Sequence, residues 1–180
     1  MLHARGCLVL FADADGASEI THLQRLEEAL MAGLGVGDHW ECPERSAIAI
    51  GSRAHLQEQA EAERTVLRNI LMWGFHFVVT AVGDVHGVKD TQCGFKLFTR
   101  SAVERTFMFQ RIRRWCFDPE LLMLAQKQHI PVHEVQIGWQ EIEGSKLTPL
   151  KAAVNMFREI LLVRMCYLFG IWYTEIAHTK

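Results

Sequence analysis

Two aspartates that follow a short apolar run are the clearest candidates for chemistry in this sequence. Asp13 and Asp15 stand in the heptapeptide FADADGA, directly after the apolar residues 7–12. In an extended chain, residues two apart point to the same side, so we expect the two carboxylates to converge where the strand ends. Such an oxygen-only pair suits Mg²⁺ or Mn²⁺ together with substrate phosphates. A solvated turn is the alternative interpretation, because D-x-D-G is also good turn chemistry.

Two segments, GSRAHLQEQAEAERTVLR and KDTQCGFKLFTR, bring four basic residues into play as candidates for binding a phosphate group: Arg53, Arg64, Arg68 and Lys96. Arg64 and Arg68 lie four apart, so they share one helix face on which two guanidiniums could grip a phosphate; exposed helix charges are the alternative. Lys96 stands between Phe95 and Leu97. We expect a lysine between apolar neighbours on a strand to point to solvent or to a ligand. Gly94, two residues before it, allows close backbone approach.

Two further segments combine charge with special backbone residues. RIRRWCFDPELL places three arginines beside a tryptophan at 111–115, which suits an anionic or membrane surface. Asp118, in the same segment, is either a functional carboxylate or the N-cap of a helix that begins at Pro119. The segment EIEGSKL places Lys146 in a glycine-containing loop, which is either a plain loop or one that folds over a diphosphate.

Composition bounds the class of protein that carries these groups. The 180 residues are 49% hydrophobic and 22% charged, which is typical of a single globular domain spanning 1–180. The net charge of −2 gives no argument for binding nucleic acid. Residues 1–90 hold 7 Lys and Arg against 13 Asp and Glu, whereas residues 91–180 hold 12 against 8. The second half is therefore the expected side for an anionic partner.

Neither a disulfide framework nor a membrane span is indicated. The five cysteines are odd in number, widely spaced and without a C-x-x-C pair, so reduced thiols are expected. The apolar run 70–82 is too short to span a bilayer, and the run 156–173 is interrupted by charged residues. Apolar helix faces at 66–82 and 150–173, if they are left uncovered, would bind lipid or a partner.

The order of predicted elements indicates an α/β fold. Residues 6–12 and 46–53 are typical of buried strands, and the first is followed by an amphipathic helix at 19–32 with Ser18 as its cap. A long helix is expected at about 57–82. This order of strand, helix, strand and helix predicts a parallel sheet.

Further elements follow in the second half. The segment 92–100 has the character of a strand, and Ser101 with Glu104 forms a predicted capping box for a short helix. A helix from Asp118 to about Gln128 and a strand at 130–139 come next. Thr148 and Pro149 predict the start of an amphipathic last helix, which runs to about 172.

Five motifs, taken in order, resemble one family over nearly the whole chain. FADADGA, GSRAHL, DTQCGFKLF, RWCFDPELL and EIEGSKL resemble the C-terminal part of the dolichyl-phosphate beta-glucosyltransferases, from about residue 6 to about 173. That family belongs to the inverting GT-A glycosyltransferases of glycosyltransferase family 2 and has a Rossmann-like sheet flanked by helices. The resemblance implies transfer of glucose from UDP-glucose to dolichyl phosphate, for protein N-glycosylation, at the cytosolic face of the endoplasmic reticulum membrane.

The resemblance also implies roles for individual residues. Asp13 and Asp15 match the D-x-D pair that holds Mg²⁺ or Mn²⁺ and the sugar nucleotide, and Lys146 falls in the loop that closes on the donor diphosphate. Asp118 matches the aspartate often named as the base. The positions that match those near the acceptor phosphate in the related mannose synthases are Arg64, Arg68 and Lys96. A phosphomonoester is already substantially deprotonated at pH 7, so Asp118 instead orients the acceptor or a cation in a second interpretation.

In that family, a membrane anchor and the first nucleotide-binding strands, with an acidic motif that grips uridine, precede the D-x-D strand. On this resemblance we expect the sequence from Met1 to begin after that segment, as in an isoform or a partial gene model. We therefore expect the chain as given to bind UDP-glucose poorly, with an inactive chain as the alternative to an active one. We also expect it to meet the membrane surface only peripherally and to expose a sheet edge that favours pairing into oligomers. The hexose itself is not determined by the motifs.

Two other functions remain as alternatives. FADADGA also imitates the nucleophile strand of a phosphatase of the haloacid dehalogenase type, with Lys89, Asp84 and Asp90 as downstream partners. A non-catalytic isoform that docks on membranes or on a partner through its apolar helices is the second alternative. Phosphate release from a phosphomonoester would favour the first, and vesicle binding without turnover of UDP-glucose would favour the second.

Overall fold

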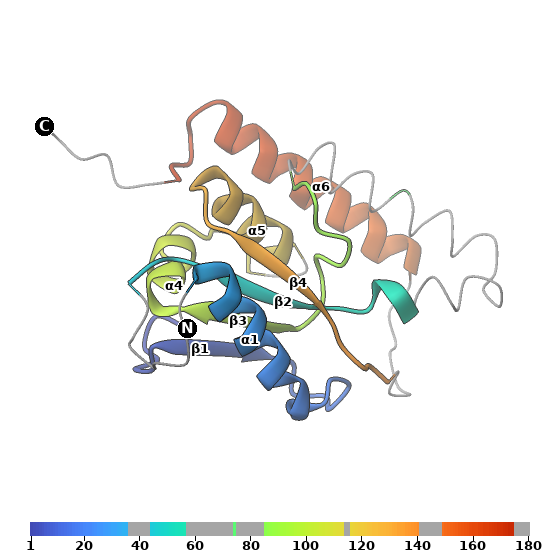
Figure 1. The fold of residues 1–180 in the computed structure, drawn as a ribbon. Helices are drawn as coiled ribbons and strands as arrows, with labels where there is room; N and C mark the ends of the chain where they lie inside the picture. The colour runs from blue at the N-terminus through green and yellow to red at the C-terminus, as the bar shows by residue number, and fades with distance from the viewer. Residues whose placement is uncertain (36–43, 57–73, 75–84, 114–115, 141–148, 175–180) are drawn as a thin grey trace, which may run out of the picture.

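The computed structural model describes residues 1–35, 44–56, 74, 85–113, 116–140 and 149–174. Their strands form one sheet in the order β1-β3-β2-β4, flanked by helices (Figure 1). The strands are β1 (Leu8–Ala12), β2 (Ile48–Ser52), β3 (Phe95–Thr99) and β4 (Val132–Gln136). The predicted α/β class is confirmed, and the architecture is consistent with a partial Rossmann-like GT-A fold.

The sheet is mixed, so the prediction of a parallel sheet was wrong. β2 and β4 are parallel, but β3 runs antiparallel to both β1 and β2. The chain therefore leaves β2 and enters β3 at the same edge of the sheet, whereas a parallel crossover would have to return to the opposite edge. The carboxyl ends of β1, β2 and β4 and the amino end of β3 meet at this edge, which we call the site edge.

β1 was expected to be buried on both faces, but it is an end strand of the described sheet. It pairs only with β3 among the described strands, and four of its five residues are half-buried or exposed. β2 is fully buried, as its apolar sequence predicts. β3 is fully buried as well, Lys96 included, which its alternating sequence did not predict. The two central strands, β3 and β2, therefore form the buried centre of the described sheet.

One helix covers one face of the sheet. α1 (Leu23–Leu34) follows the short 3-10 helix η1 (Ile20–His22) and ends at Gly35, which has φ 65°. Ser18 does not cap it, contrary to prediction, because η1 lies between them and His22 takes the N-cap position. Leu26, Leu30 and other buried side chains of α1 pack on the sheet with side chains such as Phe95 and Leu97.

The opposite face is covered by α4 (Arg100–Phe107) and α5 (Phe117–Lys127), and α6 (Pro149–Leu168) packs on α5 (Figure 1). α4 is capped by Thr99, whose hydroxyl accepts a hydrogen bond from the Ala102 N–H at 3.2 Å, so the predicted capping box was wrong. α6 begins at Pro149, as predicted. Its residues Ile160 and Val163 belong to the core.

The cysteines differ from the expectation of reduced thiols at one position. Cys93, Cys116 and Cys166 are free and buried, whereas Cys7 is disulfide-bonded. Burial raises the pKa of the Cys93 thiol to about 11 and that of Cys116 to about 12. The Cys93 and Cys116 thiols are therefore protonated at neutral pH and act as small, largely apolar groups.

Candidate functional site

Asp13 is held at the site edge by the backbone of the neighbouring strand. Its N–H donates to the carbonyl of Gly94 at 2.8 Å, which extends the pairing of β1 with β3 by one residue. The Asp13 carboxylate lies against the α carbon of Gly94, because a β carbon at position 94 would collide with it. A glycine at this place is therefore what allows the carboxylate to lie over the start of β3.

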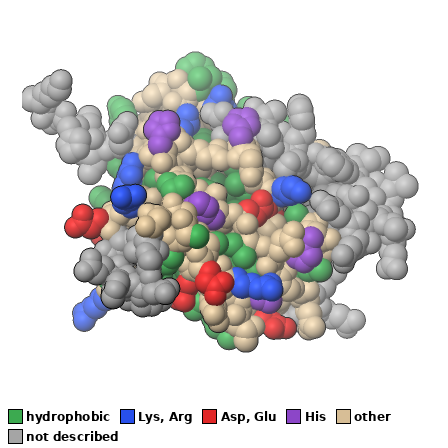
Figure 2. Space-filling view, viewed as in Figure 1, with side chains coloured by type: hydrophobic (Ala, Val, Ile, Leu, Met, Phe, Trp, Pro, Cys, Tyr) green, Lys and Arg blue, Asp and Glu red, His purple; other side chains and the backbone are tan. Residues whose placement is uncertain are grey.

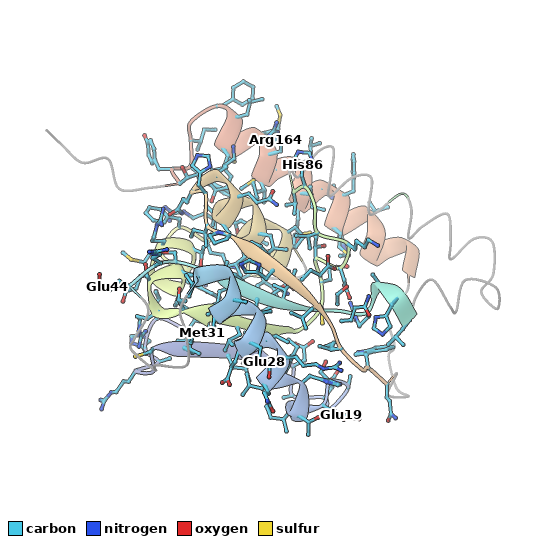
Figure 3. All side chains as sticks on the ribbon, in the orientation of Figure 1. Glu19, Glu28, Met31, Glu44, His86 and Arg164 are labelled. Atoms are coloured by element: carbon cyan, nitrogen blue, oxygen red, sulfur yellow. The ribbon has the colours of Figure 1, made fainter. Side chains whose placement is uncertain are left out.

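Asp15 lies in a turn, so the argument from an extended chain does not apply to it. The chain bends directly after Asp13, and Gly16 has φ 78°. One oxygen of the exposed Asp15 carboxylate accepts the Ala17 N–H at 3.0 Å, as in an Asx turn. The turn chemistry that the sequence offered as an alternative is thus present, and it fixes the direction of a carboxylate at the site edge. Figure 3 labels Glu19, which lies in the same loop.

Lys96 and Asp118 form a buried ion pair behind Asp13. The Lys96 ammonium lies 2.6 Å from Oδ1 of Asp118 and donates to the Cys93 carbonyl at 2.6 Å. Lys96 is 0% exposed, so it does not point to solvent, and its place near the acceptor phosphate stays a prediction. Alternation along β3 indicates the face of the sheet on which Lys96 lies, but it does not show that α5 covers that face.

Asp118 is not the N-cap of α5, contrary to one of its two predicted roles. Cys116 takes that position, and Asp118 lies within the first turn with 6% of its surface exposed. Burial raises the pKa of Asp118 most, and the charges of Asp13 and Asp90 add to the rise, although Lys96 opposes it. The charges of Asp13 and Asp90 thus act on the Asp118 carboxyl at the site edge.

Arg53 is a second fixed cation of the site, and it is one of the four basic residues that the sequence brings into play. It follows β2 directly, and its Nε and Nη2 donate to the two oxygens of Asp90 at 2.8 and 2.9 Å. Its guanidinium also lies 5.3 Å from the ring centre of Trp139. Its place directly after a buried strand, where polar groups gather in α/β folds, agrees with that interpretation, but its pairing with Asp90 was not predicted.

Arg53 and Asp90 each stabilise the charged form of the other. Burial by itself would raise the pKa of Asp90, but the hydrogen bonds and the charge of Arg53 outweigh it and lower that pKa. The same pairing raises the pKa of Arg53 against the opposing effect of burial, and the charge of Asp13 adds to that rise. Glu134 accepts the N–H groups of Lys89 and Asp90 at 3.0 and 2.9 Å, which holds the loop before β3 in place.

We predict that Asp90→Asn lowers the free energy of unfolding at pH 7 by about 3 kcal/mol, because a mostly buried guanidinium loses its charged partner. The folded-state pKa of Asp90 is lowered, so its stabilising contribution is present above pH 3.8 and is lost as the pH falls through the lower folded value. The deficit should therefore shrink in acid.

Urea unfolding of both proteins between pH 3 and pH 7 measures this deficit. Glu28→Gln, at an exposed position of α1, is the control and is expected to change stability by less than about 0.5 kcal/mol. A deficit of Asp90→Asn that stays the same over the whole pH range would contradict the prediction.

The structure brings together some of the predicted site residues and leaves others untested. Asp13, Lys96 and Asp118 are close, and Asp15 is in the adjoining turn. Arg64, Arg68 and Lys146 lie outside the described residues, so their roles stay predictions. On the face seen in Figure 2, acidic, basic and histidine side chains are interspersed.

The donor set fits a cation that takes few protein ligands. Among the described residues, no three His, Cys, Asp or Glu side chains are grouped as a metal cage. Two exposed carboxylates, Asp13 and Asp15, are available at the site edge, and one Asp15 oxygen is already used by Ala17. Mg²⁺ and Mn²⁺ suit such a site when phosphate oxygens and waters complete their coordination.

Several known proteins are similar in sequence to this chain over nearly all of its length. The chain is 46% identical over 172 residues to dolichyl-phosphate beta-glucosyltransferase of Homo sapiens, which covers 96% of this chain and 51% of the human protein. It is 47% identical over 169 residues to the protein of that name from Mus musculus, covering 94% of this chain and 50% of the mouse protein.

A more distant relative gives the same result. The dolichyl-phosphate beta-glucosyltransferase of Saccharomyces cerevisiae is 40% identical over 172 residues, covering 95% of this chain and 51% of the yeast protein. No family model matches the chain, and no solved structure matches it significantly. The chain spans about half the length of the curated relatives that it matches. Over nearly all of its own length, it is a homologue of the dolichyl-phosphate beta-glucosyltransferases.

Proposed function

We propose that this chain carries the metal- and diphosphate-binding side of a hexosyltransferase site that moves glucose from UDP-glucose to dolichyl phosphate. The observation that carries this proposal is the Asp13 carboxylate, held at the site edge against Gly94 within the D-x-D motif. Support also comes from the names of the relatives, which specify glucose as the sugar and dolichyl phosphate as the acceptor.

Asp13 and Asp15 are the residues that would hold Mg²⁺ or Mn²⁺. Bound there with the donor, the ion would neutralise charge on the departing diphosphate. Asp13 would keep its orientation through the Gly94 carbonyl, and Asp15 through the Ala17 N–H. Lys146 stays the predicted cation for the same diphosphate, from sequence only.

In this proposal, the acceptor phosphate needs little help from a general base. A phosphomonoester oxygen, already substantially deprotonated at pH 7, attacks the anomeric carbon while the bond to the UDP oxygen breaks, which inverts that carbon. Asp118 has one oxygen on Lys96 and little exposure, so we assign it the holding of that lysine near the reacting groups. Arg53, with Asp90 and Trp139 fixing it, is a cation at the same edge that could face the acceptor phosphate.

A phosphatase of the haloacid dehalogenase type gains no support. That mechanism would use Asp90 as a downstream metal ligand, but both Asp90 oxygens accept hydrogen bonds from Arg53. The relatives named above are glucosyltransferases.

The proposed activity is tested by incubating the purified chain with radiolabelled UDP-glucose, dolichyl phosphate and Mn²⁺ in detergent. Label in the lipid extract that disappears with EDTA supports the proposal. GDP-mannose and UDP-galactose in place of UDP-glucose are the controls for sugar choice. Because weak binding of UDP-glucose is expected, the donor concentration is raised until the rate no longer increases, and the absence of labelled lipid with Mg²⁺ and with Mn²⁺ at that concentration would overturn it for this chain.

We also propose that α6 lies on the cytosolic surface of the endoplasmic reticulum membrane, where the acceptor would be found. Large apolar side chains are exposed along α6 and just after it, and they include Leu161, Leu162, Leu168, Phe169, Ile171 and Tyr173. The exposed Arg158 lies on the same helix and suits anionic headgroups. No described helix is long and apolar enough to cross a bilayer.

Changing both Leu168 and Phe169 to aspartate is expected to weaken binding to vesicles by about 100-fold. The two side chains are 64% and 67% exposed, and their burial in lipid would be lost. Flotation with phosphatidylcholine and phosphatidylserine vesicles measures the binding. Ile20→Asp is the matched control, since Ile20 is 62% exposed beside α1 on the other side of the sheet. Equal flotation of all three proteins would refute the assignment.

A further inference from the structure

Residues 137–140, which we call the strap, run from the end of β4 alongside the loop that follows Asp15. The strap begins with Ile137, whose N–H donates to the Ser52 carbonyl at 3.1 Å and whose side chain is 1% exposed. Trp139 pairs with Ser18 in an isolated antiparallel bridge. The strap thus joins the ends of two strands to the D-x-D loop, although more than a hundred residues separate them in sequence.

A short series of hydrogen bonds connects the strap to the Asp15 carboxylate. The Gln140 N–H donates to the Ala17 carbonyl at 3.0 Å, and the Ala17 N–H donates to Oδ1 of Asp15 at 3.0 Å. Ala17 takes part in both hydrogen bonds. It is 5% exposed and is therefore protected from water. A displacement of the strap would therefore change the direction in which Asp15 points.

The strap also meets the second cation of the site. Trp139 lies under the Arg53 guanidinium, which is held by Asp90. The same four residues therefore contact the element that carries Asp15 and the element that carries Arg53. Their position sets the relation between a carboxylate and a cation of the site edge.

One side chain fastens the strap from the side of α1. Nε2 of His22 accepts the Gly138 N–H at 2.9 Å, which requires the neutral ring with its proton on Nδ1. A β carbon at position 138 would lie 2.9 Å from the same nitrogen, so the fit depends on glycine. His22 is the N-cap residue of α1, which fixes its backbone by the first turn of that helix.

We propose that His22 is a positioning residue of the donor site, which acts by holding the strap against the D-x-D loop and so orienting Asp15. This inference rests on the proposed function for its kinetic consequence, but not for its structural one. The role needs only a hydrogen-bond acceptor at the place of Nε2. Glutamine, whose Oε1 reaches about as far, can supply it.

Transfer kinetics of His22→Ala, His22→Gln and the unchanged chain test the kinetic consequence. His22→Ala is expected to raise the KM for UDP-glucose about tenfold and to change kcat and the KM for dolichyl phosphate less than about threefold, since it removes one hydrogen bond. His22→Gln should restore the KM to within about threefold. His3→Ala, at an exposed histidine, is the control. An unchanged KM in His22→Ala, or no rescue by glutamine, would overturn the inference.

Amide hydrogen exchange of the full chain without substrates tests the structural consequence. His22→Ala is expected to lower protection about tenfold at Gly138, Gln140 and Ala17 together, and His22→Gln to keep it. A change at Gly138 alone would overturn the inference, because the strap would then stay in place without His22. If the unchanged chain shows no transfer, the proposed function fails while the exchange experiment still decides the role of His22.

Discussion

Lys96→Met is expected to lower the free energy of unfolding by about 3–5 kcal/mol, because it leaves the Asp118 carboxylate buried without its cation. Both partners are shielded from solvent, with exposed side-chain fractions of 0% and 8%, so water cannot solvate the Asp118 carboxylate once its cation is removed. The Cys93 carbonyl also loses the hydrogen bond from Lys96. Urea unfolding at pH 7, followed by circular dichroism, measures the change.

A double variant separates the cost of the unpaired carboxylate from that of lost packing. Lys96→Met with Asp118→Leu removes both charges, so it should be more stable than Lys96→Met alone by about 2 kcal/mol or more. Arg5→Met, at an exposed position before β1, is the control and should change stability by less than about 0.5 kcal/mol. A double variant as unstable as the sum of its two single variants would contradict a coupled buried pair.

The elements that the sequence predicts well are those with a local signal. β2 is a short apolar run and a buried strand in the structure, and β3 is a strand where the alternation of its segment predicts one. Pro149 marks the first residue of α6 because its ring fits the first helical position and leaves no N–H unsatisfied. The placement of the D-x-D motif at the end of β1 was likewise predictable, since an apolar strand followed directly by two acids leaves them at the edge of the sheet.

The features that could not be predicted depend on contacts distant in sequence. Lys96 finds its partner 22 residues away, and Arg53 finds Asp90 37 residues away. Alternation along β3 could not show that α5 lies over Lys96. The direction of β3 was also unpredictable, because an apolar run has the same pattern in a parallel or an antiparallel pair. The site's cations and their partners are therefore products of the tertiary fold.

Asp13→Ala is expected to reduce metal-dependent transfer of glucose by about 1,000-fold or more, a loss of about 4 kcal/mol in transition-state stabilisation. The variant leaves Asp15 as the one carboxylate of the motif, which by itself would hold the cation and the diphosphate weakly. Asp13 is exposed, so the stability of the fold should change little. Binding of Mn²⁺ in the presence of UDP-glucose, followed by electron paramagnetic resonance, gives a second measurement that does not depend on turnover.

Gly94→Ala distinguishes the position of the Asp13 carboxylate from its mere presence. The added β carbon would occupy the place of that carboxylate, so Asp13 must rotate away while its charge is retained. Gly74→Ala is the matched control, because a β carbon there meets nothing within 4 Å. If geometry governs the site, Gly94→Ala should weaken Mn²⁺ binding at least tenfold, in the direction of Asp13→Ala, and Gly74→Ala should not. Normal Mn²⁺ binding by Gly94→Ala and Asp13→Ala alike would place the cation elsewhere, and the proposed donor site would then be wrong.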